Sequence, residues 1–143
     1  MAIQKYPHEI FEEACDIKDR NERIEYMKKN AYKQVKSILQ LQWNDKIVLD
    51  LPKGKPPFRP CPEGRVPQAI ANSFAPIGAC VVGNKNVSRL KKEKIFIGIL
   101  ESLPEETAHI LIAAKDGNLL TIKGKKYSKI TKPLVQECFP EIL

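Results

Sequence analysis

The residues best suited to chemistry in this chain are basic side chains gathered around a glycine turn. Residues 83–92 read GNKNVSRLKK, and the candidates among them are Lys85, Asn86, Arg89 and Lys91. Asn86 can cap the helix that is expected to follow, and the free N–H groups at a helix start bind phosphate when cations lie beside them. The segment does not match the P-loop, the phosphate-binding motif with the pattern G-x-x-x-x-G-K-[ST]. It predicts phosphate contacts, with an ordinary capped helix start as the alternative.

A second basic group lies toward the C-terminal end of the chain. Its members are Lys123, Lys125, Lys126, Tyr127 and Lys129. An aromatic ring among lysines can stack on an unpaired base while the ammonium groups contact phosphates. Lysines at a hairpin tip also protect a sheet edge from unwanted pairing. Both interpretations of this group stay open.

Residues for catalysis are scarce. The only histidines are His8 and His109, and neither has a nucleophile at a readable spacing. His109 has glutamates one turn before it, which predicts a local ion pair. The cysteines contain no C-x-x-C pair, which disfavours structural zinc; they are Cys15, Cys61, Cys80 and Cys138. We therefore expect no enzyme activity, no metal and no cofactor.

The positive charge is unevenly distributed along the 143 residues. The net charge is +7, yet residues 1–45 carry eight basic and eight acidic side chains, so residues 46–143, with sixteen basic and nine acidic, account for all of it. Such asymmetry favours a polyanionic partner such as nucleic acid, although a lysine-rich surface also serves solubility. No apolar run is long enough to span a membrane and no secretory leader is visible, so we expect a cytosolic protein.

Two different segments precede the densest apolar part of the chain. Residues 1–45 show apolar residues at helical spacing in two or three pieces, with Asp19 as a predicted cap. Residues 46–67 begin with a short strand-like run and continue as a basic arm with six prolines between Pro52 and Pro67. Proline excludes helix or inner strand there. Phe58 is the predicted anchor of this arm, buried against the helices, although a free recruitment arm is the alternative.

Residues 86–116 predict a pair of helices joined by a Leu103–Pro104 corner. The first has an apolar face that includes Leu90 and Phe96, and Asn86 is its expected cap. Ser102 and Glu105 resemble a capping box for the second helix, and Gly117 stands where a terminating glycine is expected. These helices need the rest of the chain to cover their apolar faces.

Four shorter elements complete the prediction. Residues 68–74 are expected to form a short helix, and residues 77–82 a buried apolar run. Residues 119–130 have the outline of a small hairpin with a basic tip, and Thr131 can cap a last short helix.

Three blocks of the sequence also resemble a known group of proteins. They are LPKG followed by PPF in residues 51–58, the stretch from Asn86 through KKEKIFIGILESL to Lys115–Asp116, and the ending ITKPLVQECFPEIL. In this order they are similar to an uncharacterised family of small proteins from T-even-like myoviruses, especially those infecting cyanobacteria. This chain has Gly83–Asn84 where that pattern has two glycines, and an insertion around residues 121–128. The resemblance covers residues 35–143 and implies a phage-encoded protein without implying an activity.

The sequence as a whole predicts a mainly α fold: a small helical domain with an extended proline-rich arm and one optional short β-hairpin. Its parts are an N-terminal helical segment (1–45), the basic arm (46–67) and a helical core (68–143). We expect a non-enzymatic accessory protein in the cytoplasm of an infected bacterium that binds nucleic acid, or a machine bound to it, through its basic surface. The alternative is a protein–protein module: a virion component, or an inhibitor or adaptor that docks on a host or phage enzyme.

Overall fold

The computed structural model describes residues 5–59, 74–122 and 126–143, and within these ranges the chain is mainly helical. The α-helices are α1 (Pro7–Asp16), α2 (Arg20–Asn30), α3 (Lys33–Trp43), α5 (Arg89–Glu101), α6 (Glu105–Lys115) and α7 (Lys132–Cys138). Short 3₁₀ turns are η1 (Ala75–Cys80), η2 (Leu119–Thr121) and η4 (Pro140–Ile142). The described ranges contain no strand longer than a single bridge, and none of their helices is long and apolar enough to cross a membrane.

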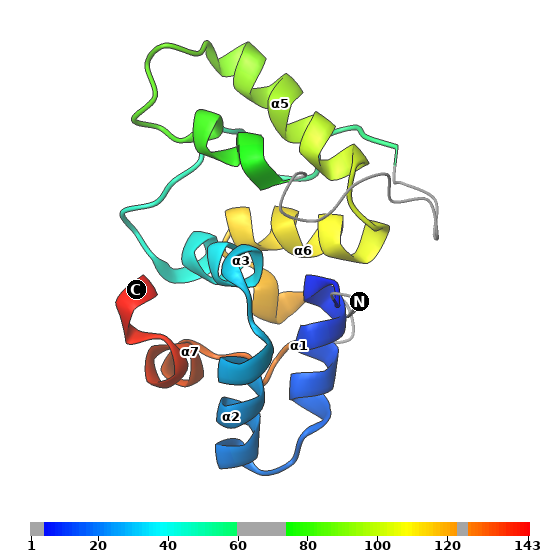
Figure 1. Ribbon diagram of the computed structural model, residues 1–143. Helices are drawn as coiled ribbons and strands as arrows, with labels where there is room; N and C mark the ends of the chain where they lie inside the picture. Colours follow the sequence, from blue (N-terminus) through cyan, green and yellow to red (C-terminus); the bar gives the residue numbers. More distant parts are fainter. Residues whose placement is uncertain (1–4, 60–73, 123–125) are drawn as a thin grey trace.

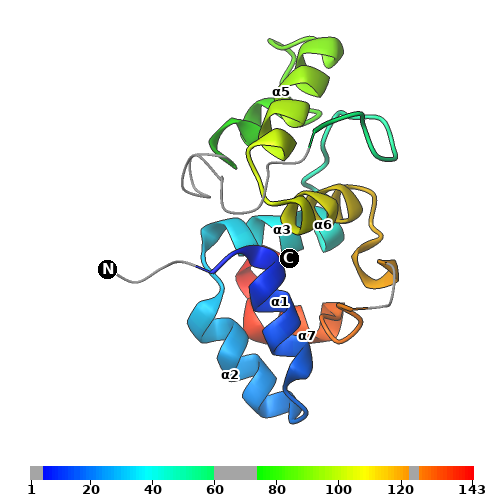
Figure 2. The same cartoon turned by 90° about the vertical axis from the view of Figure 1, so that its right-hand side faces the viewer.

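The helices are arranged in three tiers around α6 (Figure 1). The middle tier contains α6 and α3, which pack on each other. On one side lie α5 and η1, and on the other lie α1, α2 and α7, an order that is also visible after rotation (Figure 2). The buried apolar side chains of all three tiers form one continuous cluster. The predicted mainly α fold is therefore confirmed.

Local capping chemistry sets several helix ends where the sequence predicts them. Asp19 accepts a hydrogen bond from the backbone N–H of Glu22, and Thr131 accepts one from that of Leu134. After α6, Gly117 has φ 75°. Its N–H bonds to Ala114 O and the next N–H, of Asn118, bonds to Ala113 O, which is the Schellman pattern.

The expected capping box before α6 is wrong. Pro104 occupies the position before the first helical residue and offers no side-chain bond, whereas the Ser102 hydroxyl donates to Ile99 O at the end of α5. A serine at this corner thus completes the preceding helix instead of opening the next one.

Leu90, predicted on the apolar face of α5, is 64% exposed because the buried face runs instead through Lys92, Phe96, Ile99 and Leu100.

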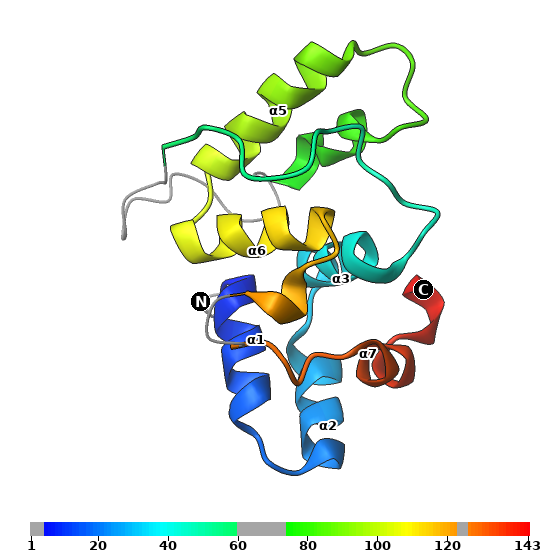
Figure 3. The same ribbon diagram turned by 180° about the vertical axis from the view of Figure 1, so that it is seen from behind.

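The described part of the arm, residues 46–59, is held to the helices by backbone bonds and two buried lysines. Leu49 and Val81 form an isolated antiparallel bridge. The ammonium group of Lys92, 2% exposed, bonds to Asp50 Oδ2 at 3.1 Å and to Val81 O at 3.0 Å. Lys115 donates to Pro52 O at 2.9 Å. Seen from behind, the arm crosses between α5 and α6 (Figure 3).

Phe58 docks on the helices as predicted, but it is only half-buried. Its ring meets His109 of α6 edge to face at 6.2 Å between centroids, and Lys55 lies over the same ring at 5.6 Å. The full burial that the sequence suggested is wrong, because one side of the ring faces the exposed lysine and not a second layer of helices.

The prediction of a hairpin at residues 119–130 is also wrong, because the described residues on either side of its tip do not form strands. Residues 119–121 form η2, and residues 126–129 form turns. Leu119, Tyr127 and Ile130 are buried among the helices, so the apolar flanks join the core instead of pairing with each other.

Of the predicted buried run 77–82, Cys80 is buried but Val82 is 55% exposed. The short helix expected at residues 68–74 lies almost wholly outside the described residues.

Phe58→Ala should lower the free energy of unfolding by about 1–2 kcal/mol. This is less than the roughly 3–5 kcal/mol of a fully buried aromatic ring, because the native ring keeps part of its solvent contact. Urea unfolding measures the change. A loss of about 3–5 kcal/mol in the free energy of unfolding would mean that the ring is fully buried. An unchanged free energy of unfolding would mean that the arm does not dock on the helices.

Lys92→Met should lower the free energy of unfolding by about 2–4 kcal/mol, since it leaves Asp50 and Val81 O without their buried partner. The neighbouring Lys91 is exposed, so Lys91→Met is the matched control and should stay within about 0.5 kcal/mol of the wild type. Equal effects of the two substitutions in urea unfolding would contradict the role given to Lys92.

Candidate nucleic-acid interface

The structure concentrates the positive charge on one tier of the fold. The described arm residues 46–59, together with residues 74–101 of η1 and α5, carry nine basic and three acidic side chains. All other described residues carry twelve basic and thirteen acidic side chains, so they are close to neutral. We call residues 46–59 and 74–101 the basic lobe. Its basic members are Lys46, Lys53, Lys55, Arg59, Lys85, Arg89, Lys91, Lys92 and Lys94.

α5 starts two residues later than the sequence predicts. Ser88, not Asn86, is the cap, and its hydroxyl accepts from Lys91 N at 3.2 Å. Asn86 lies in the preceding loop, where its N–H bonds to the side-chain oxygen of Asn84 at 3.1 Å. This bond closes the loop before the helix begins, and Asn86 lies two residues before the observed cap.

The basic residues at this helix start have different environments. Arg89 lies 3.6 Å from Asp50 Oδ1, and Lys92 neutralises the other oxygen of the same carboxylate. Lys85, Lys91 and Lys94 are exposed and form no ion pair with the described acidic residues. The unpaired positive charge of α5 and of the loop before it therefore resides on these three lysines.

The arm adds exposed cations beside α5. Lys53, Lys55 and Arg59 are all exposed, and the N–H of Arg59 donates to Glu101 at the end of α5. Because the arm is tied to α5 and α6, its cations keep a defined position relative to Lys91 and Lys94. A fixed array of cations suits the regularly spaced charges of a phosphate backbone.

The second predicted group is not part of this lobe. Lys123 and Lys125 lie outside the described residues. Lys126 and Lys129 are exposed, and the segment of residues 126–129 lies on the other side of α6 from α5 (Figure 2). Tyr127 is 2% exposed and packs edge to face on Phe11 at 6.0 Å. Its predicted role as a stacking platform for a base is therefore wrong, because its ring fills the core.

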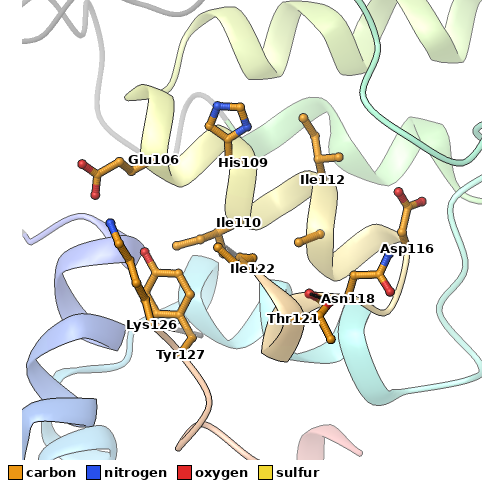
Figure 4. Close-up of a pocket in the computed structure, with 11 residues that line it drawn as sticks. Glu106, His109, Ile110, Ile112, Asp116, Asn118, Thr121, Ile122, Lys126 and Tyr127 are labelled. Carbon is orange, nitrogen blue, oxygen red and sulfur yellow. Dashed lines mark hydrogen bonds between the residues drawn. The ribbon is translucent and has the colours of Figure 1, made fainter. Parts of the chain in front are cut away.

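A hollow of about 780 Å³ lies between α6 and the segment that follows it. Its apolar part includes Ile110, Ile112 and Ile122 (Figure 4). At one end, Figure 4 shows the Lys126 ammonium and the Tyr127 hydroxyl on the side where the Glu106 carboxylate lies. Burial, followed by the nearby glutamates, raises the pKa of Tyr127, so it stays a neutral phenol.

Two carboxyl groups meet beside this end of the hollow. Burial raises the pKa of Glu12, and the charge of Glu106 and a hydrogen bond with it act in the same direction. His8 and Lys126 oppose the shift. His8 Nε2 lies 3.8 Å from Glu106, and His8 Nδ1 lies 2.7 Å from the Thr107 hydroxyl. The arrangement is a pair of carboxyl groups, one from α1 and one from α6, in which the charged form of Glu12 is disfavoured.

The remaining candidates for chemistry have structural surroundings. His109 lies 3.4 Å from Glu105, as its spacing predicts. Burial raises the pKa of Cys15, Cys80 and Cys138, which keeps these thiols protonated and weakly nucleophilic. Cys61 lies outside the described residues. No cluster of His, Cys, Asp or Glu that could hold a metal ion occurs in the described part of the chain.

Sequence reasoning missed three features of this region: the buried Lys92, the buried Lys115 and the Glu12–Glu106 pair. For Lys92 a signal was present, because it lies four residues before Phe96 on the buried face of α5. A lysine on an apolar helical face requires a partner, and such a position can be recognised from spacing alone. The carboxyl pair joins residues far apart in the chain and has no such signal.

Comparison with known proteins identifies a family. The model of a protein family described as "Family of unknown function (DUF6433)" matches residues 10–121. The matched range includes the basic lobe and α6 and ends before Lys126. No curated protein and no solved structure matches the chain.

Glu12→Gln should stabilise the protein at neutral pH. The pKa of Glu12 is higher in the native state than its ordinary value of 4.5 in the unfolded chain. The free energy of unfolding therefore falls as the pH rises through 4.5 and through the native pKa, and it stays lower at every pH above both. Glutamine keeps the shape and the hydrogen bond without the charge. We expect a higher Tm at about pH 7 and little change at about pH 3.5.

Glu13→Gln is the matched control on the same helix and should act in the opposite direction. Hydrogen bonds from Lys5 and Tyr26 lower the pKa of Glu13, so its contribution is present above the ordinary value of 4.5 and is lost as pH falls through the native pKa. The variant should lower Tm at about pH 7. The same sign for both variants in thermal melts would contradict the carboxyl pair.

Proposed function

Starting from the fact that the chain belongs to this family of unknown function, DUF6433, we propose that it is a phage-encoded, non-enzymatic accessory protein that binds nucleic acid through the basic lobe. The observation that carries this proposal is the separation of charge: nine basic against three acidic side chains on the lobe, and near neutrality elsewhere in the described residues. The resemblance of three sequence blocks to a family of myovirus proteins supports a phage origin. A phage protein of this kind would act in the cytoplasm of the infected bacterium.

The lobe suits a polyanion for a physical reason beyond its net charge. Its acidic residues are Asp50, Glu93 and Glu101, and Asp50 is already neutralised by Lys92 and Arg89. Exposed lysines on both α5 and the arm therefore retain their attraction for phosphate. Each phosphate contact releases bound counterions, so such binding depends strongly on salt.

A protein partner is the second candidate, and exposed apolar side chains favour it. Val48 is 51% exposed, Val82 is 55% exposed and Leu90 is 64% exposed. Val48 and Val82 are neighbours, because Val82 N donates to Val48 O at 2.9 Å. Apolar side chains beside the cations of the lobe are consistent with an adaptor or virion component that docks on another protein.

Binding to mixed-sequence DNA and RNA should be mainly electrostatic. For about five neutralised phosphates, affinity falls on the order of 500-fold between 50 and 200 mM salt. Replacing Lys85, Lys91 and Lys94 together by Gln should reduce that fall to about tenfold, since roughly two phosphate contacts remain. Fluorescence anisotropy at a series of salt concentrations measures both slopes.

The matched control replaces Lys126, Lys129 and Lys132 by Gln, which removes the same charge from the neutral side of α6. It should leave the salt slope unchanged. Equal effects of the two triple variants would indicate an unlocalised charge effect and not a site. Absence of binding at low salt and tens of micromolar protein would reject the nucleic-acid function and favour the alternative function as a protein–protein module.

A further inference from the structure

A second, smaller hollow lies inside the basic lobe, between the arm and α5. Its volume is about 270 Å³. The arm residues 51–57 form one wall, and Glu93, Phe96 and Ile97 of α5 form the other, with Lys115 of α6 completing the lining. We call this hollow the arm groove. Two exposed cations of the arm, Lys53 and Lys55, are among its lining residues.

The arm groove is held open by interactions that do not involve a ligand. Lys115 donates to Pro52 O and lies 2.6 Å from Asp116, and Asp116 in turn accepts from Gly54 N at 2.9 Å. Gly54 has φ 94°, a backbone conformation that suits glycine and lets the arm turn at this point. A wall fixed in this way is preorganised, which reduces the entropy lost on binding.

The lining of the arm groove combines apolar walls, one acceptor and two cations. Leu51, Pro56 and Ile97 are half-buried and present apolar surface. Glu93 is its acidic member, and no described basic side chain forms an ion pair with it. Lys53 and Lys55 are exposed on the arm wall, whereas the Lys115 ammonium is already occupied by the arm.

This combination matches an unpaired nucleobase in a strand. A base has flat apolar faces for the walls, and its phosphates can reach the two arm lysines. The volume lies just below the range of about 300–1,000 Å³ typical of pockets for drug-sized ligands, so it is suited to one small ring system. Bases in a duplex are stacked and paired, and they cannot enter such a hollow without being flipped out.

We propose that the arm groove binds one unpaired base of a single strand, and that Glu93 accepts a hydrogen bond from its exocyclic amino group. The proposal rests on the proposed function, and it adds strand type and base preference. Cytosine presents an amino donor where uracil presents a carbonyl acceptor, so the carboxylate of Glu93 favours cytosine. The remaining lobe cations contact the flanking phosphates.

The test is fluorescence anisotropy at low salt with labelled oligo(dC), oligo(dU) and a mixed-sequence duplex of equal length. Oligo(dC) should bind about tenfold more tightly than oligo(dU) and than the duplex. Glu93→Gln, a change that leaves the walls intact, should reduce the preference for oligo(dC) over oligo(dU) to about twofold, because the neutral amide can donate to uracil as well as accept from cytosine.

A second variant tests the hollow itself. Ile97→Trp places a bulky ring in the arm groove and should reduce single-strand affinity about tenfold, to that of the duplex. Leu90→Trp is its matched control, since Leu90 lies on the same helix, is 64% exposed and does not line the groove. Melting curves of both variants establish that they are folded.

The outcomes separate this inference from the function on which it rests. Equal affinity for all three oligonucleotides, unchanged by Ile97→Trp and Glu93→Gln, would overturn the base site while leaving a basic lobe that binds backbone phosphates. Absence of binding to every oligonucleotide would overturn both. Single-strand preference that is lost in Ile97→Trp and kept in Leu90→Trp supports the base site.

Discussion

The arrangement of the basic lobe depends on two buried ammonium groups. A buried charge is strongly unfavourable unless it is paired and fully hydrogen-bonded. Lys92 meets this requirement with Asp50 and a backbone carbonyl, and Lys115 meets it with Asp116 and the carbonyl of Pro52. In both cases the partners belong to the arm or to the elements that flank it. The proline-rich arm has few backbone bonds of its own, and these lysines give it a defined course.

That course determines which cations are free to bind a partner. The ammonium groups of Lys92 and Lys115 are paired with Asp50 and Asp116, so they do not attract a partner. Arg89 is partly neutralised by Asp50. The cations that remain exposed on the lobe belong to the arm, to α5 and to the loop before α5. The bonds of Lys115 also fix the arm wall of the arm groove, because Lys115 lines the groove and donates to Pro52 O.

The opposite side of α6 has a different character. There, basic and acidic side chains nearly balance, and Tyr127 packs on Phe11 inside the core. Glu12 and Glu106 meet close to this ring, where burial raises the pKa of Glu12. The pair brings a side chain of α1 next to a side chain of α6. The fold therefore separates a cationic tier from a neutral tier, with α6 between them.

The sequence by itself determined the mainly α class and the helix ends at Asp19, Thr131 and Gly117, because these depend on spacing and on side-chain bonds within a few residues. It also located the net charge beyond residue 45. Tertiary structure alone decided that Tyr127 is a core residue, and that residues 119–130 join the helices instead of pairing as a hairpin. It also decided which lysines are buried and which are free. Those outcomes depend on contacts between residues far apart in the chain, and local propensity carries no information about such contacts.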